Sequence, residues 1–299
     1  MLRYNRLNLI LFIVAAGLCG ILLWWQPAVQ PHNDARPLAA CQPDAIKRIV
    51  IAHGDHTTLT LVKTNTDWHL ETPFAAPASA YRVRALLGLC QAVSQSDYPA
   101  SSLDLAQLGL ATPHTVVRMD EAIFRLGGGE PLQGQRYLLL DNLVYLISGI
   151  LYPTEDDAAS FVDPTLMTDG GAIVALSFSA LPGSSAIEAT QSDGHWRINP
   201  PRPDLSADWW PMLADGWRRI RAVEVRRDAM GASLGSITVT LAQVAHPLRF
   251  EVLSMNPEVV LRRADLHLRY VLPHDIAWGL LHIPAVDEVQ STSAQKVGE

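Results

Sequence analysis

The chain has 299 residues, a formal net charge of -7 and only 18% charged residues. This mildly acidic composition excludes a typical nucleic-acid-binding protein, because binding to phosphates needs concentrated Lys and Arg. Hydrophobic residues make up 48% of the chain, so the composition predicts packed cores and excludes a largely disordered protein.

The N-terminus predicts a transmembrane anchor. An apolar run covers residues 7–25 and would extend about 28 Å as a helix, close to the roughly 30 Å of a bilayer's hydrocarbon core. Arg3 and Arg6 precede this run, and Trp24 lies at its end, where aromatic side chains favour the membrane interface. The positive-inside rule therefore predicts a cytoplasmic N-terminus, residues 1–6, and a periplasmic bulk.

Two other interpretations of the N-terminus are a cleaved signal peptide and a lipoprotein. No small-x-small cleavage site follows the apolar run directly. Cys19 follows a large Leu inside the run, and Cys41 lies well beyond it, so neither cysteine is in register for lipid attachment. A single-pass bacterial inner-membrane protein is the favoured interpretation.

The segments that flank the main body are polar. Residues 26–45 are rich in Pro and polar side chains and predict a linker. No later apolar segment is long enough to span a bilayer. The tail, residues 286–299, is polar and is expected to be disordered.

The first half of the body, residues 46–160, predicts an α+β module. The alternation of apolar and polar residues predicts strands, and apolar residues at helical spacing predict a helix over residues 78–93. Leu103 to Leu110 predicts a short helical turn, and Gly127-Gly128-Gly129 predicts a turn between strands. The strands are expected over residues 46–53, 58–62, 68–70, 116–117, 123–126, 137–140 and 144–147.

The second half, residues 172–285, predicts a similar module. Ser206 is expected to cap a helix that carries Trp209, Trp210, Leu213 and Trp217. The strands are expected over residues 173–178, 187–190, 196–198, 222–225, 237–241, 248–253, 259–261, 266–272 and 276–283.

The two halves have a similar order of features. Trp68-His69-Leu70-Glu71-Thr72-Pro73 has a loose echo in Trp196-Arg197-Ile198-Asn199-Pro200, and a helix pattern and further strands follow each. Phe124-Arg125-Leu126 matches residues 249–252, and Arg136-Tyr137-Leu138 matches residues 269–271. This shared order predicts a tandem duplication. The expected fold is therefore α+β, with an N-terminal transmembrane helix and two tandem modules of mainly antiparallel sheet, each covered by a helix.

The first module resembles the catalogued domain of unknown function 4340. The resemblance covers residues 46–160, with a fainter copy over residues 172–285, and it implies an auxiliary component of a gliding-motility-type ABC transporter. The second copy lacks the Leu-Gly-Leu-x-x-Pro turn, and the family offers no catalytic residues to transfer. The resemblance rests on Trp68-x-Leu70-x-x-Pro73, Leu86-Leu87-x-Leu89, Leu105-x-x-Leu108-Gly109-Leu110-x-x-Pro113, Phe124-x-Leu126-Gly127, Arg136-Tyr137 and Val144-Tyr145-Leu146-Ile147.

No motif in the sequence predicts a catalytic centre, a metal site or a cofactor. His53-x-x-His56 lies at a predicted turn, without the further ligands of a tetrahedral metal site. Gly127-Gly128-Gly129 lacks the Lys and Ser or Thr of a phosphate-binding loop, and no Gly-x-Ser-x-Gly elbow occurs.

The best candidate for an interaction surface is the second predicted helix and its end. It combines three tryptophans with three arginines, and both residue types are enriched in binding hot spots. The tryptophans are Trp209, Trp210 and Trp217, and the arginines are Arg218, Arg219 and Arg221. The alternative is an amphipathic helix that buries Trp210, Leu213 and Trp217 while its arginines face solvent.

Cys41 and Cys90 would both face an oxidising periplasm, where they could form a disulfide. The alternative for Cys90 is a small core residue on the apolar stripe of the first helix.

From the anchor, the two modules and the lack of a catalytic motif, we expect a non-enzymatic periplasmic scaffold that accompanies a membrane protein. The alternatives are a periplasmic hydrolase with a site between the modules and a small-ligand or glycan-binding module.

Overall fold

The computed structural model describes residues 36–283, except 39, 55, 95, 131–133, 149–153, 155–156, 169 and 230. Within this part of the chain, no helix combines the length and the apolar character needed to cross a membrane. The predicted anchor over residues 7–25, most of the linker and the tail over residues 286–299 lie outside the described residues.

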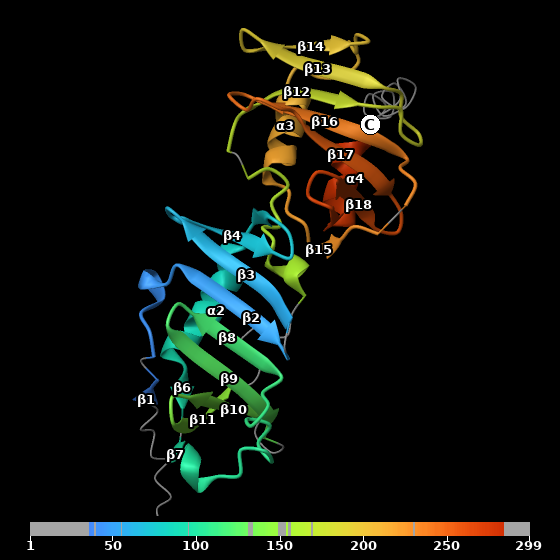
Figure 1. Ribbon diagram of the computed structural model, residues 1–299. Helices are drawn as coiled ribbons and strands as arrows, with labels where there is room; N and C mark the ends of the chain where they lie inside the picture. Colours follow the sequence, from blue (N-terminus) through green and yellow to red (C-terminus); the bar gives the residue numbers. More distant parts are fainter. Residues whose placement is uncertain are drawn as a thin grey trace, which may run out of the picture.

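Two antiparallel sheets form the two bodies of an elongated molecule, one above the other in Figure 1. The prediction of a mainly antiparallel α+β protein is confirmed at this level. The first sheet has the order β5 (Ala76–Pro77), β4 (Asp67–Thr72), β3 (His56–Thr64), β2 (Arg48–His53), β8 (Thr115–Met119), β9 (Ala122–Gly129), β10 (Gln135–Leu140), β11 (Leu143–Ser148) and β7 (Asp97–Pro99). The second has the order β14 (His195–Asn199), β13 (Ile187–Ser192), β12 (Ile173–Phe178), β16 (Gly235–Leu241), β17 (Leu248–Ser254), β18 (Val259–Arg263), β19 (Leu268–Leu272) and β15 (Glu224–Arg227).

The strand orders of the two sheets correspond. The first three strands of each sheet are neighbours, the next four continue on the other side, and a short strand that precedes those four in sequence pairs with the last of them. Trp68 and Trp196 occupy the same place in their hairpins, since each is the second residue after a two-residue turn and pairs with Lys63 or Gln191. Among the strands that the structure describes in the first sheet, only β5 lacks a counterpart in the second.

One face of each sheet is buried against helices. In the first sheet, alternate residues such as Ile49 and Ile51 are buried, and α2 (Ala80–Leu87) packs Val83 and Leu86 into the same core. A side-chain cap on Arg82 N by Ser79 begins α2. In the second sheet, α3 (Trp209–Arg219) and α4 (His274–Leu281) pack against each other on the core face.

Several predicted elements are wrong in type or extent. The helix expected over residues 78–93 ends at Leu87 and continues as a 3-10 turn, η2 (Gly88–Gln91), because Val93 turns outward into β6 (Val93–Ser94). The strand expected over residues 276–283 is α4, whose short apolar run is compatible with either period. Ser206 does not cap α3, which begins after Asp208.

Two further differences concern the first body. The predicted glycine turn is wrong, since Gly127-Gly128-Gly129 form the end of β9. A glycine is needed at residue 127 because Leu108 O approaches it so closely that a Cβ there would lie 2.4 Å away. By contrast, the short helical turn predicted over Leu103 to Leu110 is present, since Leu108 N donates to Asp104 O at 3.4 Å and Gly109 ends the turn with a φ of 67°. By its place in the strand order, β10 corresponds to β18. The predicted match of Arg136-Tyr137 with residues 269–271, which lie on β19, is therefore displaced by one strand.

Part of the predicted linker is attached to the first body. β1 (Arg36–Pro37) pairs with β6, and the Ala40 N–H donates to Cys90 O at 3.0 Å. Cys41 and Cys90 form a disulfide, with their Cα atoms 4.8 Å apart. The chain is therefore fixed to the body from residue 36 onward, where the composition alone predicts a free linker.

A short connecting segment, residues 157–168, joins the two bodies by backbone hydrogen bonds on both sides. On the first body, Ser79 N donates to Phe161 O at 2.7 Å, and Asp163 N donates to Pro77 O at 2.9 Å. On the second body, Ala222 N donates to Pro164 O at 2.9 Å. We name this segment the junction.

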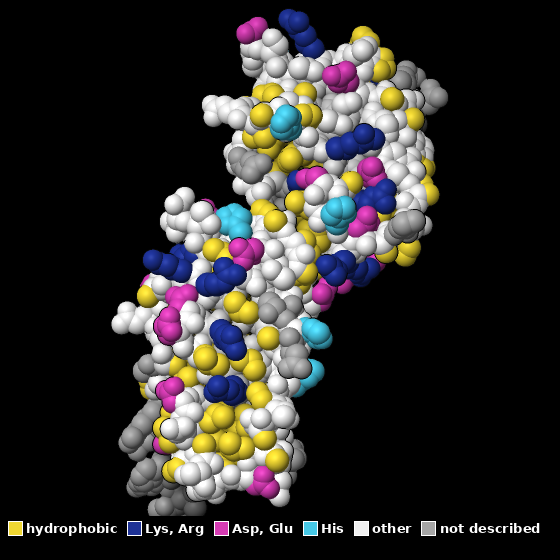
Figure 2. Space-filling model, in the orientation of Figure 1, with side chains coloured by type: hydrophobic (Ala, Val, Ile, Leu, Met, Phe, Trp, Pro, Cys, Tyr) yellow, Lys and Arg dark blue, Asp and Glu magenta, His cyan; other side chains and the backbone are white. Residues whose placement is uncertain are grey.

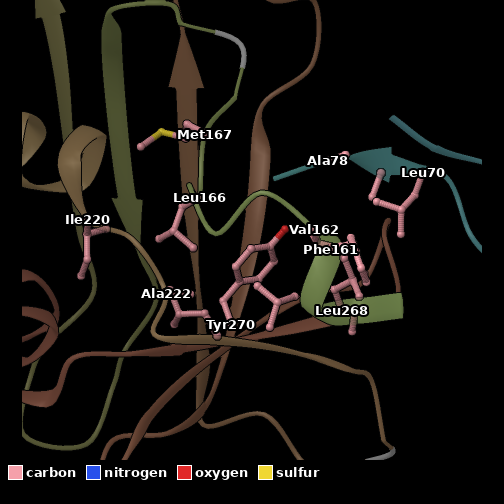
Figure 3. Close-up of a cluster of buried hydrophobic side chains, with 14 of the residues drawn as sticks. Leu70, Ala78, Phe161, Val162, Leu166, Met167, Ile220, Ala222, Leu268 and Tyr270 are labelled. Carbon is pink, nitrogen blue, oxygen red and sulfur yellow. The ribbon is translucent and has the colours of Figure 1, made fainter. Parts of the chain in front are cut away.

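Buried side chains complete the junction. Figure 3 shows Phe161 and Val162 of the junction between Leu70 of the first body and Leu268 and Tyr270 of the second. Phe161 is fully buried, and the 3-10 turn η4 (Ala158–Phe161) holds it there. The hydrophobic cores of the two bodies are thus continuous, which opposes independent motion of the two sheets.

Candidate functional site

The aromatic side chains of the predicted interaction helix are mostly core residues. Trp210 is 2% exposed and Trp217 is 1% exposed, and the Trp217 indole N–H donates to Leu280 O at 3.3 Å. Trp209 is half-buried and packs edge-on against Trp210. The helix is therefore amphipathic, as the alternative prediction had it, and Trp210 and Trp217 are not accessible to a partner.

The arginines at the end of α3 do face solvent. Arg219 pairs with Asp215 one turn earlier at 2.6 Å, and Arg221 approaches Asp163 of the junction to 3.7 Å. Arg218 is also exposed. Such exposed pairs add less than about 1 kcal/mol to stability, so these cations are available for contacts with another molecule.

Two clefts lie beside the junction, where the hydrolase alternative places a site. The first, of about 380 Å³, is lined by the β3–β4 turn, by Asp67, Trp68 and His69, and by Asp163. The second, of about 270 Å³, lies between the start of α2, the junction and β15.

Neither cleft assembles a nucleophile with a histidine base from its lining residues. Of the two serines in the second cleft, Ser79 accepts a hydrogen bond from Arg82 N, and Ser160 donates to Asp157 O at 2.7 Å. Both hydroxyls thus cap local turns, and no histidine lines this cleft. The first cleft has His69 with the hydroxyls of Thr66 and Thr168, but among the described residues no hydrogen bond joins His69 to either hydroxyl, and Thr66 Oγ1 donates to Asp67 Oδ2 at 3.5 Å.

The remaining candidate residues have structural contacts. A His53 ring nitrogen, Nε2, lies 2.9 Å from Thr154 O, and the ring stacks on His114 with centroids 5.4 Å apart. Gly127 and its neighbours line an open hollow of about 610 Å³, where Arg136 Nε donates to Gly127 O at 2.8 Å. Among the described residues, no three His, Cys, Asp or Glu side chains are grouped so that they could hold a metal ion.

The outer faces of the two sheets differ in chemistry. The first carries half-buried apolar residues such as Val50 and Ile123 beside exposed Arg118, and Figure 2 shows hydrophobic and basic side chains interspersed on the lower body. The second carries a charged row, in which Arg262 pairs with both Glu251 and Asp228. The charged row of the second sheet favours contact with solvent, whereas the apolar residues of the first sheet can also contact another molecule.

Ion pairs and burial explain the perturbed acidities near the junction. A hydrogen bond from Arg226 lowers the pKa of Glu224, and a hydrogen bond from Arg263 lowers the pKa of Asp265. Burial raises the pKa of the Tyr270 phenol to about 12. Each shift favours the form that the group has at neutral pH, the ionised carboxylate or the neutral phenol, so none singles out an acid or base for catalysis.

The outer edge of the second sheet, at β14, is a feature that the sequence did not predict. In the first sheet, β5 covers the outer side of β4, and Ala78 N donates to Trp68 O at 2.9 Å. In the second sheet, β14 is the last strand, and no strand among the described residues pairs with its outer side. A sequence signal exists, because the chain continues after β14 through Pro200, Pro201 and Pro203, where the first module has Ala75-Ala76-Pro77-Ala78.

Comparison of this chain with known protein families, with curated proteins and with solved structures finds no match.

Proposed function

We propose that this chain is a non-enzymatic, single-pass inner-membrane protein whose bulk forms a scaffold in the bacterial periplasm. The scaffold consists of two tandem copies of one α+β module. The observation that carries the proposal is the junction, which joins two sheets of corresponding strand order into one elongated body (Figure 1). A rigid body of this shape can position a binding surface at a fixed distance from a membrane.

The periplasmic location has two independent supports. The first is the basic and apolar pattern of the N-terminus, in which Arg3 and Arg6 precede the run over residues 7–25. The second is the disulfide between Cys41 and Cys90, because structural disulfides persist in oxidising compartments and are rare in the cytosol.

The partner class rests on a resemblance alone. The order of motifs over residues 46–160 resembles that of the domain of unknown function 4340, and this resemblance implies an ABC-type transporter as the membrane partner. The contacts with such a partner would come from this chain's own surface. The exposed cations at the end of α3, namely Arg218, Arg219 and Arg221, are one such surface.

Topology provides the first test. A C-terminal fusion to alkaline phosphatase should be active, and a C-terminal fluorescent protein that folds only in the cytoplasm should remain dark. A fusion truncated after residue 6 provides the cytoplasmic control. The opposite pattern, or release of a soluble mature chain by osmotic shock, contradicts the anchored scaffold.

The arginine surface provides the second test. Replacing Arg218, Arg219 and Arg221 together by Ala should reduce co-purification with an inner-membrane partner about tenfold, which corresponds to about 1.4 kcal/mol. The melting temperature should change little, because the ion pairs involved are exposed.

The matched control for this test is Arg249→Ala, an exposed arginine on the outer face of the second sheet. Equal partner recovery by the triple variant and the control contradicts a role for the α3 end. A His53 or Ser184 substitution that abolishes the cellular phenotype without loss of stability would favour the hydrolase alternative instead.

A further inference from the structure

The two modules differ at one equivalent edge. A two-residue turn, Asp193-Gly194, joins β13 to β14, so Ser192 and His195 form the closing hydrogen-bonded pair. Hydrogen-bonded and non-hydrogen-bonded pairs alternate along an antiparallel ladder. The backbone N–H and C=O groups of Trp196 and Ile198 therefore point away from β13, toward the free side of β14.

The first module shows what covers such an edge. Trp68 and Leu70 hold the equivalent positions on β4, and their outward groups face β5. Ala76 lies opposite Leu70, Pro77 lies opposite His69, and Ala78 N donates to Trp68 O at 2.9 Å. The covering segment is short, extended and small, with alanines at the two positions that face the strand's backbone groups.

The second module does not supply this segment from the residues that follow β14. Pro200, Pro201 and Pro203 lack the N–H groups that a paired strand needs. Trp196 and Ile198 are half-buried on the core side of β14, and His195 and Arg197 are exposed on the other side. No ion pair of Arg197 occurs within the described part of the chain.

We propose that β14 is a strand-addition site for an extended segment of a partner protein, with the pattern small, acidic, small. The small residues lie opposite Trp196 and Ile198, as Ala78 and Ala76 lie opposite Trp68 and Leu70. The acidic residue lies opposite Arg197, which forms no ion pair among the residues that the structure describes. Main-chain hydrogen bonds supply the affinity, and the side-chain pattern supplies the specificity.

This inference deepens the proposed scaffold function and rests on it, because it assigns the scaffold's partner-binding edge. In Figure 1, β14 lies at the end of the molecule opposite β1, the start of the described chain. An anchor before β1 would thus leave the β14 edge on the side of the scaffold away from the membrane.

The test uses the full chain in detergent and a synthetic peptide, acetyl-Thr-Val-Ala-Glu-Ala-Val-Thr-amide. Amide hydrogen exchange should slow at Trp196 and Ile198 when the peptide is added, while Trp68 and Leu70 should not change. A peptide with both alanines N-methylated should bind at least tenfold more weakly, because it cannot donate to the strand. This control leaves the protein unaltered, so its result does not depend on the folding of a variant.

Charge is tested separately. Replacing the peptide's Glu by Lys, or Arg197→Ala in the protein, should weaken binding about threefold, as expected for one exposed ion pair. The Arg249→Ala variant, which changes an exposed arginine on β17, should bind the original peptide like the unchanged protein. Equal binding of the N-methylated peptide, or protection at residues other than Trp196 and Ile198, overturns the proposal.

Other occupants of the edge give different results. If the chain's own tail covers β14, removing residues 284–299 should speed exchange at Trp196 and Ile198 without any peptide. If a second copy covers it, exchange at these amides should slow as protein concentration rises. Either result overturns the partner segment. A cytoplasmic C-terminus in the fusion experiment contradicts the scaffold function instead, whatever the peptide does.

Discussion

Phe161→Ala should lower the free energy of unfolding by about 3–5 kcal/mol, the cost of removing a large side chain from a packed core. Phe161 is fully buried in the junction, and its carbonyl accepts the hydrogen bond from Ser79 N. Because the cores of the two bodies are continuous there, the variant should weaken both bodies together and loosen their attachment.

The measurement is urea unfolding of the full chain, followed by tryptophan fluorescence and by far-ultraviolet circular dichroism. The unchanged protein should give coincident transitions, while Phe161→Ala should shift the midpoint and separate the two signals, since most tryptophans lie in the second body. Met212→Ala is the matched control, because Met212 is 72% exposed and should cost less than about 0.5 kcal/mol. A loss below about 1 kcal/mol at Phe161 would show that the junction does not join the bodies.

Removing the disulfide should cost about 4 kcal/mol, the chain-entropy value for a loop of this length. Cys41 and Cys90 are 49 positions apart, and the bond fixes the segment that leads into the first body. The double variant Cys41→Ala with Cys90→Ala avoids placing a hydroxyl at the fully buried Cys90. Its thermal and urea midpoints should fall, and a reductant should bring the unchanged protein to the same values.

Cys19→Ser is the control for this experiment, because Cys19 lies in the predicted anchor and should not respond. Alkylation of thiols in intact cells tests the compartment directly. Cys41 and Cys90 should be blocked until a reductant is added. Free thiols at both positions in cells would contradict the oxidising location, and an unchanged midpoint in the double variant would contradict the structural role of the bond.

The amino-acid sequence alone determined most local structure. Alternating residues such as Ile49 and Ile51 predicted strands, and Val83 and Leu86 at helical spacing predicted α2. These patterns work because a strand repeats every two residues and a helix every 3.6, so one buried face is legible in a short window. Short apolar runs such as residues 276–283 fit either period, which is why α4 was misassigned.

Tertiary structure alone decided the features on which the proposed function rests. Contacts between distant residues set the order of strands, the pairing of Cys41 with Cys90, the burial of Trp210 and the place of β14 at the edge of its sheet. A helix with three tryptophans and with arginines at and just beyond its end has the same composition whether its aromatic face meets a partner or its own sheet. The sheet behind α3 settles that choice, because it offers the apolar surface against which the tryptophans lose their contact with water.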